Sequence, residues 1–304
     1  MTLAFAARFA ESPRPMRIAA LVLLTACTTP VSVAEQDIIG GTRSTGAAAT
    51  MLLASYPANM SVLDTCSAVL VSPTVLLTSA HCVDSPNHPS YVYGVFPGDD
   101  ASAYTTLAQL APHLLAVTSV KAHPDYVTTT PFYADLGVVV LAAPLTTVTP
   151  LPMHRTPVDQ SLVGKAATIV GYGQTVYQTP NQTRYEATTT VTAIQDDTIV
   201  VGDATKHGCL GDSGGPAIVD GVLVGVDSYG PPGCTDASHY RRVDAFLPFL
   251  DQYVPPPASP DAGPSMGPDA GTEDKGGGGC STTGGGAGLA LGLALIGVRR
   301  RRAA

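Results

Sequence analysis

Residues 211–216, with the sequence Gly-Asp-Ser-Gly-Gly-Pro, place a serine between an aspartate and two glycines. A turn of this composition can expose the Ser213 hydroxyl and bring backbone N–H groups together beside it. That arrangement suits a nucleophile next to an oxyanion hole. Taken alone, the six residues could equally form an ordinary tight turn.

Two further residues could activate such a serine. His81 follows the apolar run 74–78, and Asp135 stands at the mouth of the apolar run 136–141. A histidine can take the serine proton as a general base, and a carboxylate can orient the imidazole and stabilise its cation. Each residue alone is more commonly a packing or turn residue. A fourth stretch, Ile-Ile-Gly-Gly at 38–41, follows a short polar segment.

In this order the four stretches resemble the chymotrypsin-like (trypsin-fold) serine proteases. The resemblance covers residues 38–254, with supporting matches at 122–126 (Ala-His-Pro-Asp-Tyr), 171–173 (Gly-Tyr-Gly) and 228–230 (Ser-Tyr-Gly). It implies an all-β fold of two packed six-stranded antiparallel barrels with a C-terminal helix. We accordingly expect a monomeric serine endopeptidase that acts on polypeptide substrates and has no cofactor or metal.

The resemblance gives individual residues a role. Ser213 matches the nucleophile, His81 the general base, and Asp135 the carboxylate that steers the imidazole. The N–H groups of Gly211 and Ser213 match the oxyanion hole. Ser228 matches the residue that donates a hydrogen bond to the triad aspartate.

The resemblance also implies synthesis as a zymogen. Ile38 matches the residue whose freed α-amino group pairs with Asp212 inside the protein. The family usually has a basic residue before that cut, whereas this chain has Asp37. Self-activation by a trypsin-like activity is therefore not expected, and a separate activating protease that cuts after an acidic residue, or one of broad specificity, is implied.

The specificity pocket departs from the trypsin pattern. His207 stands at the floor position, six residues before the nucleophile, where trypsins have aspartate; Gly230 and Ser238 match the walls, and Asp227 could face the same space. A protonated His207 would attract an acidic side chain. Alternatively, His207 and Asp227 satisfy each other and leave a neutral polar pocket, or His207 points away.

A catalytically inactive homologue that binds partners is the rival interpretation. The unusual pocket floor, the few disulfides and Tyr229 where tryptophan is common lend it weight, although no triad residue is missing.

Four cysteines lie in the body of the chain: Cys66, Cys82, Cys209 and Cys234. They allow three pairings, and export would permit disulfides. If Cys66 pairs with Cys82 and Cys209 with Cys234, each disulfide would stabilise the fold by on the order of 3 kcal/mol. A zinc site is the alternative, but no spacing typical of zinc ligands occurs. The adjacent acids Asp99 and Asp100 leave calcium binding open.

Short strands must position these residues. Runs rich in valine, leucine and threonine, bounded by turn residues, predict strands at 67–71, 74–78, 136–141, 167–171 and 222–228. Asp244 could cap a final helix, along which Val243, Leu247, Leu250 and Val254 recur at helical spacing. Residues 38–254 contain 8 basic and 17 acidic residues, a balance that argues against nucleic acid as a partner.

The two ends of the chain predict export. Residues 1–34 read as a secretory signal peptide, with Cys27 in a possible lipoprotein box as the alternative, and residues 35–37 as a short propeptide. Residues 255–279 contain six prolines and seven glycines and read as a linker. Residues 280–304 resemble the sorting tails of myxobacterial surface proteins. That resemblance implies transient membrane attachment and secretion, or display on the cell surface of a Gram-negative bacterium.

Overall fold

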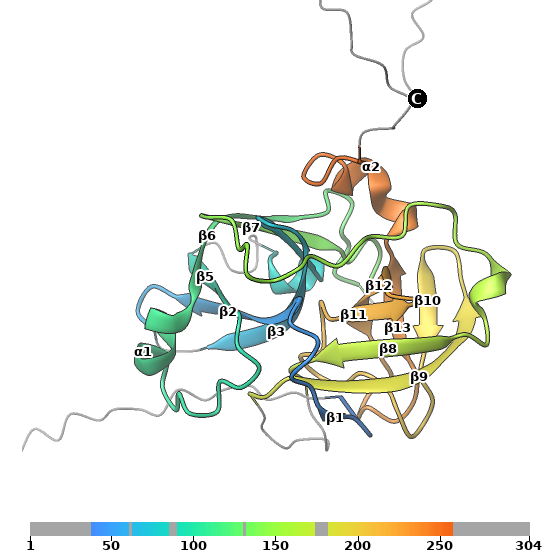
Figure 1. The fold of residues 1–304 in the computed structure, drawn as a ribbon, viewed down its shortest axis with the longest axis horizontal. Helices are drawn as coiled ribbons and strands as arrows, with labels where there is room; N and C mark the ends of the chain where they lie inside the picture. The colour runs from blue at the N-terminus through green and yellow to red at the C-terminus, as the bar shows by residue number, and fades with distance from the viewer. Residues whose placement is uncertain (1–37, 61–62, 85–89, 130–131, 174–181, 258–304) are drawn as a thin grey trace, which may run out of the picture. The chain divides into compact units, whose positions relative to one another are not determined.

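The computed structural model describes residues 38–60, 63–84, 90–129, 132–173 and 182–257 (Figure 1). The predicted signal peptide, propeptide and sorting tail, and nearly all of the linker, lie outside these residues. A search of the described helices finds none with the length and hydropathy needed to cross a membrane.

The first half of the body forms a closed six-stranded antiparallel barrel (Figure 1). Its strands pair in the order β2-β3-β4-β7-β6-β5, and β5 returns to pair with β2. Short helical turns interrupt the barrel connections: η1 (Ala80–Cys82), α1 (Leu107–Leu110) and η2 (Ala111–His113). The strands are β2 (Thr50–Pro57), β3 (Asp64–Ser72), β4 (Val75–Thr78), β5 (Tyr91–Phe96), β6 (Leu115–Ala122) and β7 (Gly137–Leu141).

The second half forms a second ring of six antiparallel strands. It runs β8-β9-β10-β13-β12-β11 and closes where β11 pairs with β8. The short strand β1 (Thr42–Arg43) pairs with β9 outside the ring. A single turn, η3 (Gln160–Leu162), precedes β8. The strands are β8 (Ala166–Gly171), β9 (Tyr185–Ile194), β10 (Thr198–Val201), β11 (Pro216–Val219), β12 (Val222–Tyr229) and β13 (Ser238–Arg242).

Each barrel encloses its own apolar core, and a third cluster lies where the barrels meet. In β9 buried and exposed residues alternate at Ala187, Thr188 and Thr189, because successive side chains of a strand point to opposite faces. At the junction, Leu77 of the first barrel shares a cluster with Val226 of the second. The active-site residues described below lie at this junction.

All five predicted strands are present, as parts of β3, β4, β7, β8 and β12. The C-terminal helix is shorter than the repeat of apolar residues indicates: a 3-10 turn, η4 (Asp244–Phe246), leads into one turn of α-helix, α2 (Leu247–Leu250). The predicted cap at Asp244 is wrong. Its carboxylate accepts hydrogen bonds from the Val158 N–H and the Arg242 guanidinium, and no side chain caps η4 or α2.

Candidate active site

Two hydrogen bonds connect His81 and Asp135 at one end of the first barrel. His81 lies in η1, directly after β4, and Asp135 lies just before β7, which pairs with β4. The backbone N–H of His81 donates to Oδ1 of Asp135 at 2.9 Å, and Nδ1 of His81 lies 2.8 Å from Oδ2. Since a carboxylate only accepts, Nδ1 carries a proton, so Nε2 of a neutral imidazole is free to accept one.

The Asp135 carboxylate is held in its ionised form. Burial alone would raise its pKa, but the charge and hydrogen bonds of His81 and the hydroxyl of Ser228 outweigh it and lower the pKa below its ordinary value. Ser228, in β12 of the second barrel, donates to Oδ2 at 2.6 Å. The neighbouring Ala134 has φ of +49°, a left-handed conformation that costs a non-glycine residue on the order of 1 kcal/mol. This left-handed turn directly precedes Asp135.

Ser213 lies in a tight loop just before β11. Gly211 and Gly214 on either side have φ of +86° and +87°, a conformation open to glycine. The backbone N–H groups of Asp212, Gly214 and Gly215 donate to carbonyl oxygens of Cys209, Asp227 and Asp212. Within the described residues, the N–H groups of Gly211 and Ser213 make no such bond. Two donors of the loop are therefore left for a ligand.

Ser213 and His81 line the same two pockets, although no hydrogen bond joins them in the described part of the chain. One pocket, of about 270 Å³, includes Gly211 and the Cys66–Cys82 side of the site. The other, of about 640 Å³, extends toward Ser228 and Gly230. An extended chain lying across Ser213 would therefore find space on both sides of the serine.

Asp212 is buried without a cation beside it in the described residues. Its side chain accepts the N–H groups of Gly173 at 2.8 Å and Cys209 at 2.9 Å. Burial raises its pKa to about 8, against the lowering effect of these two bonds. The side chain of Ile38 is also buried, and the N–H of Ile39 donates to the His207 carbonyl at 3.0 Å. The start of the body thus lies against the segment that leads to Asp212.

The four predicted pocket residues separate into two groups. Asp227, Gly230 and Ser238 line the larger pocket. His207 is fully buried and is not among its lining residues; its Nδ1 lies 2.8 Å from the carbonyl oxygen of Gly208. No hydrogen bond between His207 and Asp227 is present in the described residues, so the arrangement matches the third alternative, with His207 turned away.

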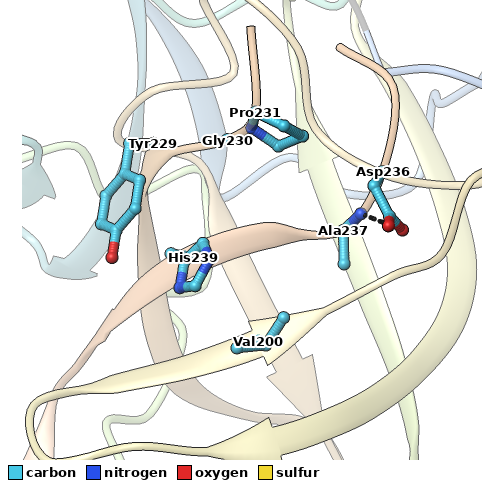
Figure 2. Close-up of a pocket in the computed structure, with 7 residues that line it drawn as sticks. All are labelled: Val200, Tyr229, Gly230, Pro231, Asp236, Ala237 and His239. Carbon is cyan, nitrogen blue, oxygen red and sulfur yellow. Dashed lines mark hydrogen bonds between the residues drawn. The ribbon is translucent and has the colours of Figure 1, made fainter. Parts of the chain in front are cut away.

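A smaller hollow of about 390 Å³ adjoins Gly230 (Figure 2). Tyr229 stacks on His239 with ring centroids 4.4 Å apart and planes within 4°, and the guanidinium of Arg241 lies 5.5 Å from the Tyr229 ring centroid. Burial and the charge of Arg241 lower the pKa of His239 and so favour the neutral imidazole. A flat aromatic surface therefore borders the larger pocket.

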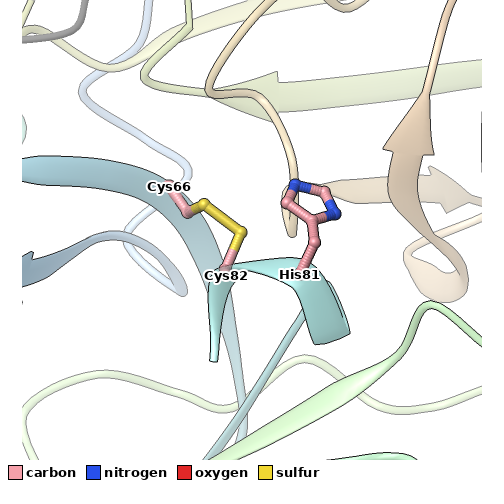
Figure 3. A group of neighbouring side chains, drawn as sticks. All are labelled: Cys66, His81 and Cys82. Carbon is pink, nitrogen blue, oxygen red and sulfur yellow. A yellow bond between two sulfur atoms is a disulfide. The ribbon is translucent and has the colours of Figure 1, made fainter. Parts of the chain in front are cut away.

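Each disulfide joins two cysteines that follow one another in the order of cysteines along the chain: Cys66 to Cys82, and Cys209 to Cys234. The first lies beside His81 (Figure 3), and the ligand atoms of these three residues are within 4.8 Å of one another. The sulfurs are bonded to each other and cannot act as thiolate ligands for zinc. Elsewhere, Arg43 pairs with the Asp100 carboxylate at 3.0 Å and supplies a positive charge at the acids for which calcium binding was left open.

Ser67 is a site residue that the sequence reasoning missed. Its backbone N–H donates to the Ser213 carbonyl at 2.9 Å, and its fully buried hydroxyl donates to the Gly211 carbonyl at 3.0 Å and accepts the N–H of Tyr172. Ser67 thereby fixes both ends of the loop that carries the two free donors. A hydroxyl at the start of the apolar run 67–71 was the one available signal.

Comparison with known proteins agrees with this geometry. The family model described as Trypsin matches residues 38–250. The chain is 29% identical over 208 residues to a trypsin of Phaedon cochleariae, covering 62% of this chain and 78% of that one. It is also 29% identical over 211 residues to a trypsin of Saccharopolyspora erythraea, covering 62% and 86%.

Solved structures share the fold. Mouse neuropsin, a serine protease, superposes with a TM-score of 0.56 at 21% identity, covering 71% of this chain and all of that one. The two closed barrels, the matched family model and the named relatives lead to one assignment. The chain belongs to the trypsin family of serine endopeptidases.

Proposed function

We propose that this chain is an exported endopeptidase that cleaves peptide bonds through an acyl-enzyme on Ser213. One observation carries the proposal: His81 is bonded twice to an ionised, buried Asp135, and its ring lies in the same two pockets as Ser213. His81 would take the proton of the Ser213 hydroxyl as the oxygen attacks the carbonyl carbon, and would pass it to the leaving amine. Water would then hydrolyse the ester by the same route.

The absence of a bond between Ser213 and His81 is compatible with this role, because catalytic hydrogen bonds in unliganded enzymes are often long and tighten with substrate. The free N–H groups of Gly211 and Ser213 would stabilise the oxyanion that forms during the attack. Loss of one such donor typically costs about 10²- to 10³-fold in rate.

Activation would follow cleavage between Asp37 and Ile38 by another protease. The new α-ammonium group of Ile38 would supply the cation that the buried Asp212 carboxylate lacks among the described residues. Because Asp212 adjoins Ser213, that ion pair would fix the loop in its competent form. A buried pair stabilises a protein only when both partners are present, so the uncleaved chain would be a zymogen.

Export is the remaining part of the proposal. The signal-like residues 1–34, the linker and the tail at 280–304 would carry the enzyme out of a Gram-negative cell and hold it transiently at the surface. The two disulfides support export, because such bonds persist in oxidising compartments.

Active-site labelling tests the catalytic proposal. Protein processed to begin at Ile38 should react with a fluorophosphonate probe, whereas uncleaved protein and a processed Ser213→Ala variant should not. N-terminal sequencing of the labelled band would report the processing site. Correctly processed protein that takes no label would contradict the proposal and favour the binding homologue.

A further inference from the structure

Asp227 is a buried acid that the proposed chemistry does not use. It lies in β12 beside Ser228, and only 4% of its surface is exposed. Its Oδ1 has no hydrogen-bond partner among the residues that the structure describes. The residue lines the pocket of about 640 Å³ that also contains His81 and Ser213. An unpartnered carboxylate oxygen in the wall of a substrate pocket can accept a hydrogen bond from a ligand.

The backbone holds Asp227 firmly in this wall. Its carbonyl oxygen accepts the hydroxyl of Ser79 and the N–H of Gly214, and its own N–H donates to the Gly215 carbonyl at 2.8 Å. These partners flank the loop of Ser213 and the turn of His81. The carboxylate therefore has a fixed position relative to both proposed catalytic residues.

Gly208 makes room for this carboxylate. A Cβ atom at Gly208 would lie 2.7 Å from Oδ2 of Asp227 and 3.0 Å from Oγ of Ser238. Any side chain at position 208 would thus collide with Asp227, whereas glycine leaves both oxygens beside one point of the pocket wall. Two oxygen atoms from different strands converge there.

The hydroxyl oxygen of Ser238 and an ionised Asp227 carboxylate can both accept hydrogen bonds. The Ser238 hydroxyl donates to the Gly208 carbonyl at 3.2 Å, which leaves its lone pairs free. Nδ1 of His207 must donate to the same carbonyl, and His207 does not line the pocket. The described lining contains no lysine or arginine. A side chain rich in donors would complement this wall.

Charge points to the same kind of ligand. Burial raises the pKa of Asp227 well above its ordinary value; the nearby Asp212 and Asp135 raise it further, and a backbone hydrogen bond from Ser228 only partly opposes them. Burial therefore favours the protonated form of this carboxyl when no cation lies beside it. An entering cation would let it ionise and form a buried, charge-assisted hydrogen bond.

We propose that Asp227, on the pocket wall, determines specificity in place of the missing floor aspartate, and that the pocket takes the lysine or arginine side chain immediately before the scissile bond. The inference rests on the proposed function of Ser213. With Asp227 in this role, the enzyme would prefer a cationic side chain before the scissile bond, and not the acidic side chain that a protonated His207 would attract.

Matched peptide substrates test it. Processed enzyme would be assayed on peptides that differ only before the scissile bond, with arginine, lysine, glutamine, glutamate or phenylalanine there. We expect kcat/KM for arginine and lysine to exceed that for glutamine on the order of 100-fold, and Asp227→Asn to remove most of this difference. Asp236→Asn, which deletes an exposed acid near the pocket, is the matched control and should change it less than about threefold. A preference for glutamate or phenylalanine, or an unchanged preference in Asp227→Asn, would overturn the proposal.

A binding measurement separates this inference from the catalytic proposal. Benzamidine, which is cationic, and benzamide, which is neutral, would be titrated calorimetrically into the processed Ser213→Ala variant. We expect benzamidine to bind more tightly, and Asp227→Asn to weaken it on the order of 100-fold while leaving benzamide unchanged. Equal affinity for the two probes would refute the role of Asp227. Failure of fluorophosphonate labelling with selective benzamidine binding would refute the catalytic proposal alone.

Discussion

Replacing Asp212 by asparagine is expected to reduce the loss of stability that the uncleaved chain undergoes as pH rises. In that chain burial raises the pKa of Asp212 from 3.8 to about 8. A carboxyl whose folded pKa lies above its unfolded value contributes stability that is fully present below pH 3.8. That contribution is lost as the pH rises through the folded pKa. Asparagine carries no charge at any pH and abolishes this dependence.

The difference between 3.8 and about 8 corresponds to on the order of 5 kcal/mol, at 1.36 kcal/mol for each unit of pKa. About 4 kcal/mol of that falls between pH 5 and pH 9, because the unfolded carboxyl is already ionised at pH 5 while the folded one stays protonated up to about 8. In the cleaved chain the α-ammonium group of Ile38 would pair with Asp212 and lower its pKa, so the part of the loss that is due to Asp212 should largely disappear.

Urea unfolding at pH 5 and pH 9 measures both effects. Cleaved and uncleaved forms would be compared in the Ser213→Ala background, which prevents self-digestion, each with Asp212 retained and with the Asp212→Asn substitution. Asp227 titrates in every form, and Asp212 raises its pKa, so the difference between paired variants reports Asp212 together with its effect on Asp227. The reasoning is refuted if the uncleaved chain loses no more stability at pH 9 than its Asp212→Asn variant.

Three further substitutions probe the packing of the site. Ser67→Ala removes the partner of the Gly211 carbonyl and the Tyr172 N–H, and should lower the free energy of unfolding by about 1 to 3 kcal/mol in urea titrations. Its kcat should fall while KM stays nearly constant; unchanged kcat would show that the loop holds without it. Gly171→Ala would drive its Cβ atom into Oδ1 of Asp212, so burst titration should find few active molecules; a full count of active sites would contradict the contact. Replacing Cys66 and Cys82 together by alanine should destabilise the fold by on the order of 3 kcal/mol, measured by thermal unfolding against the Cys209/Cys234 double variant.

Local patterns in the sequence predicted five of the thirteen strands of the described residues. Valine- and leucine-rich runs bounded by turn residues predicted strands such as β7 and β12, because period and composition are local properties. The cap at Asp244 failed because its carboxylate is bonded to Val158, which is 86 residues away in the chain. No local pattern reveals such a competitor.

The same distinction applies to the site. The motif order indicated that His81, Asp135 and Ser213 belong together. The role of Ser67 could not be read, because the Gly211 carbonyl that it contacts is 144 residues away. At the pocket, a position six residues before the serine suggested His207, yet its ring turns to the Gly208 carbonyl and Asp227 faces the cavity. The direction of the His207 side chain depends on its tertiary contacts, which cannot be read from the local sequence.

The proposed catalytic groups are divided between the barrels. The two barrels lie side by side (Figure 1). His81 and Asp135 come from the first barrel, whereas Ser213 and Ser228 come from the second. The Ser228–Asp135 and Ser67–Ser213 hydrogen bonds join the two barrels. A misplacement of about 1 Å can cost roughly 100-fold in rate. A low concentration of denaturant that lets one barrel shift against the other should therefore inactivate the enzyme while both barrels stay folded. Catalytic activity should then be lost at a lower denaturant concentration than the one at which circular dichroism or fluorescence detects unfolding.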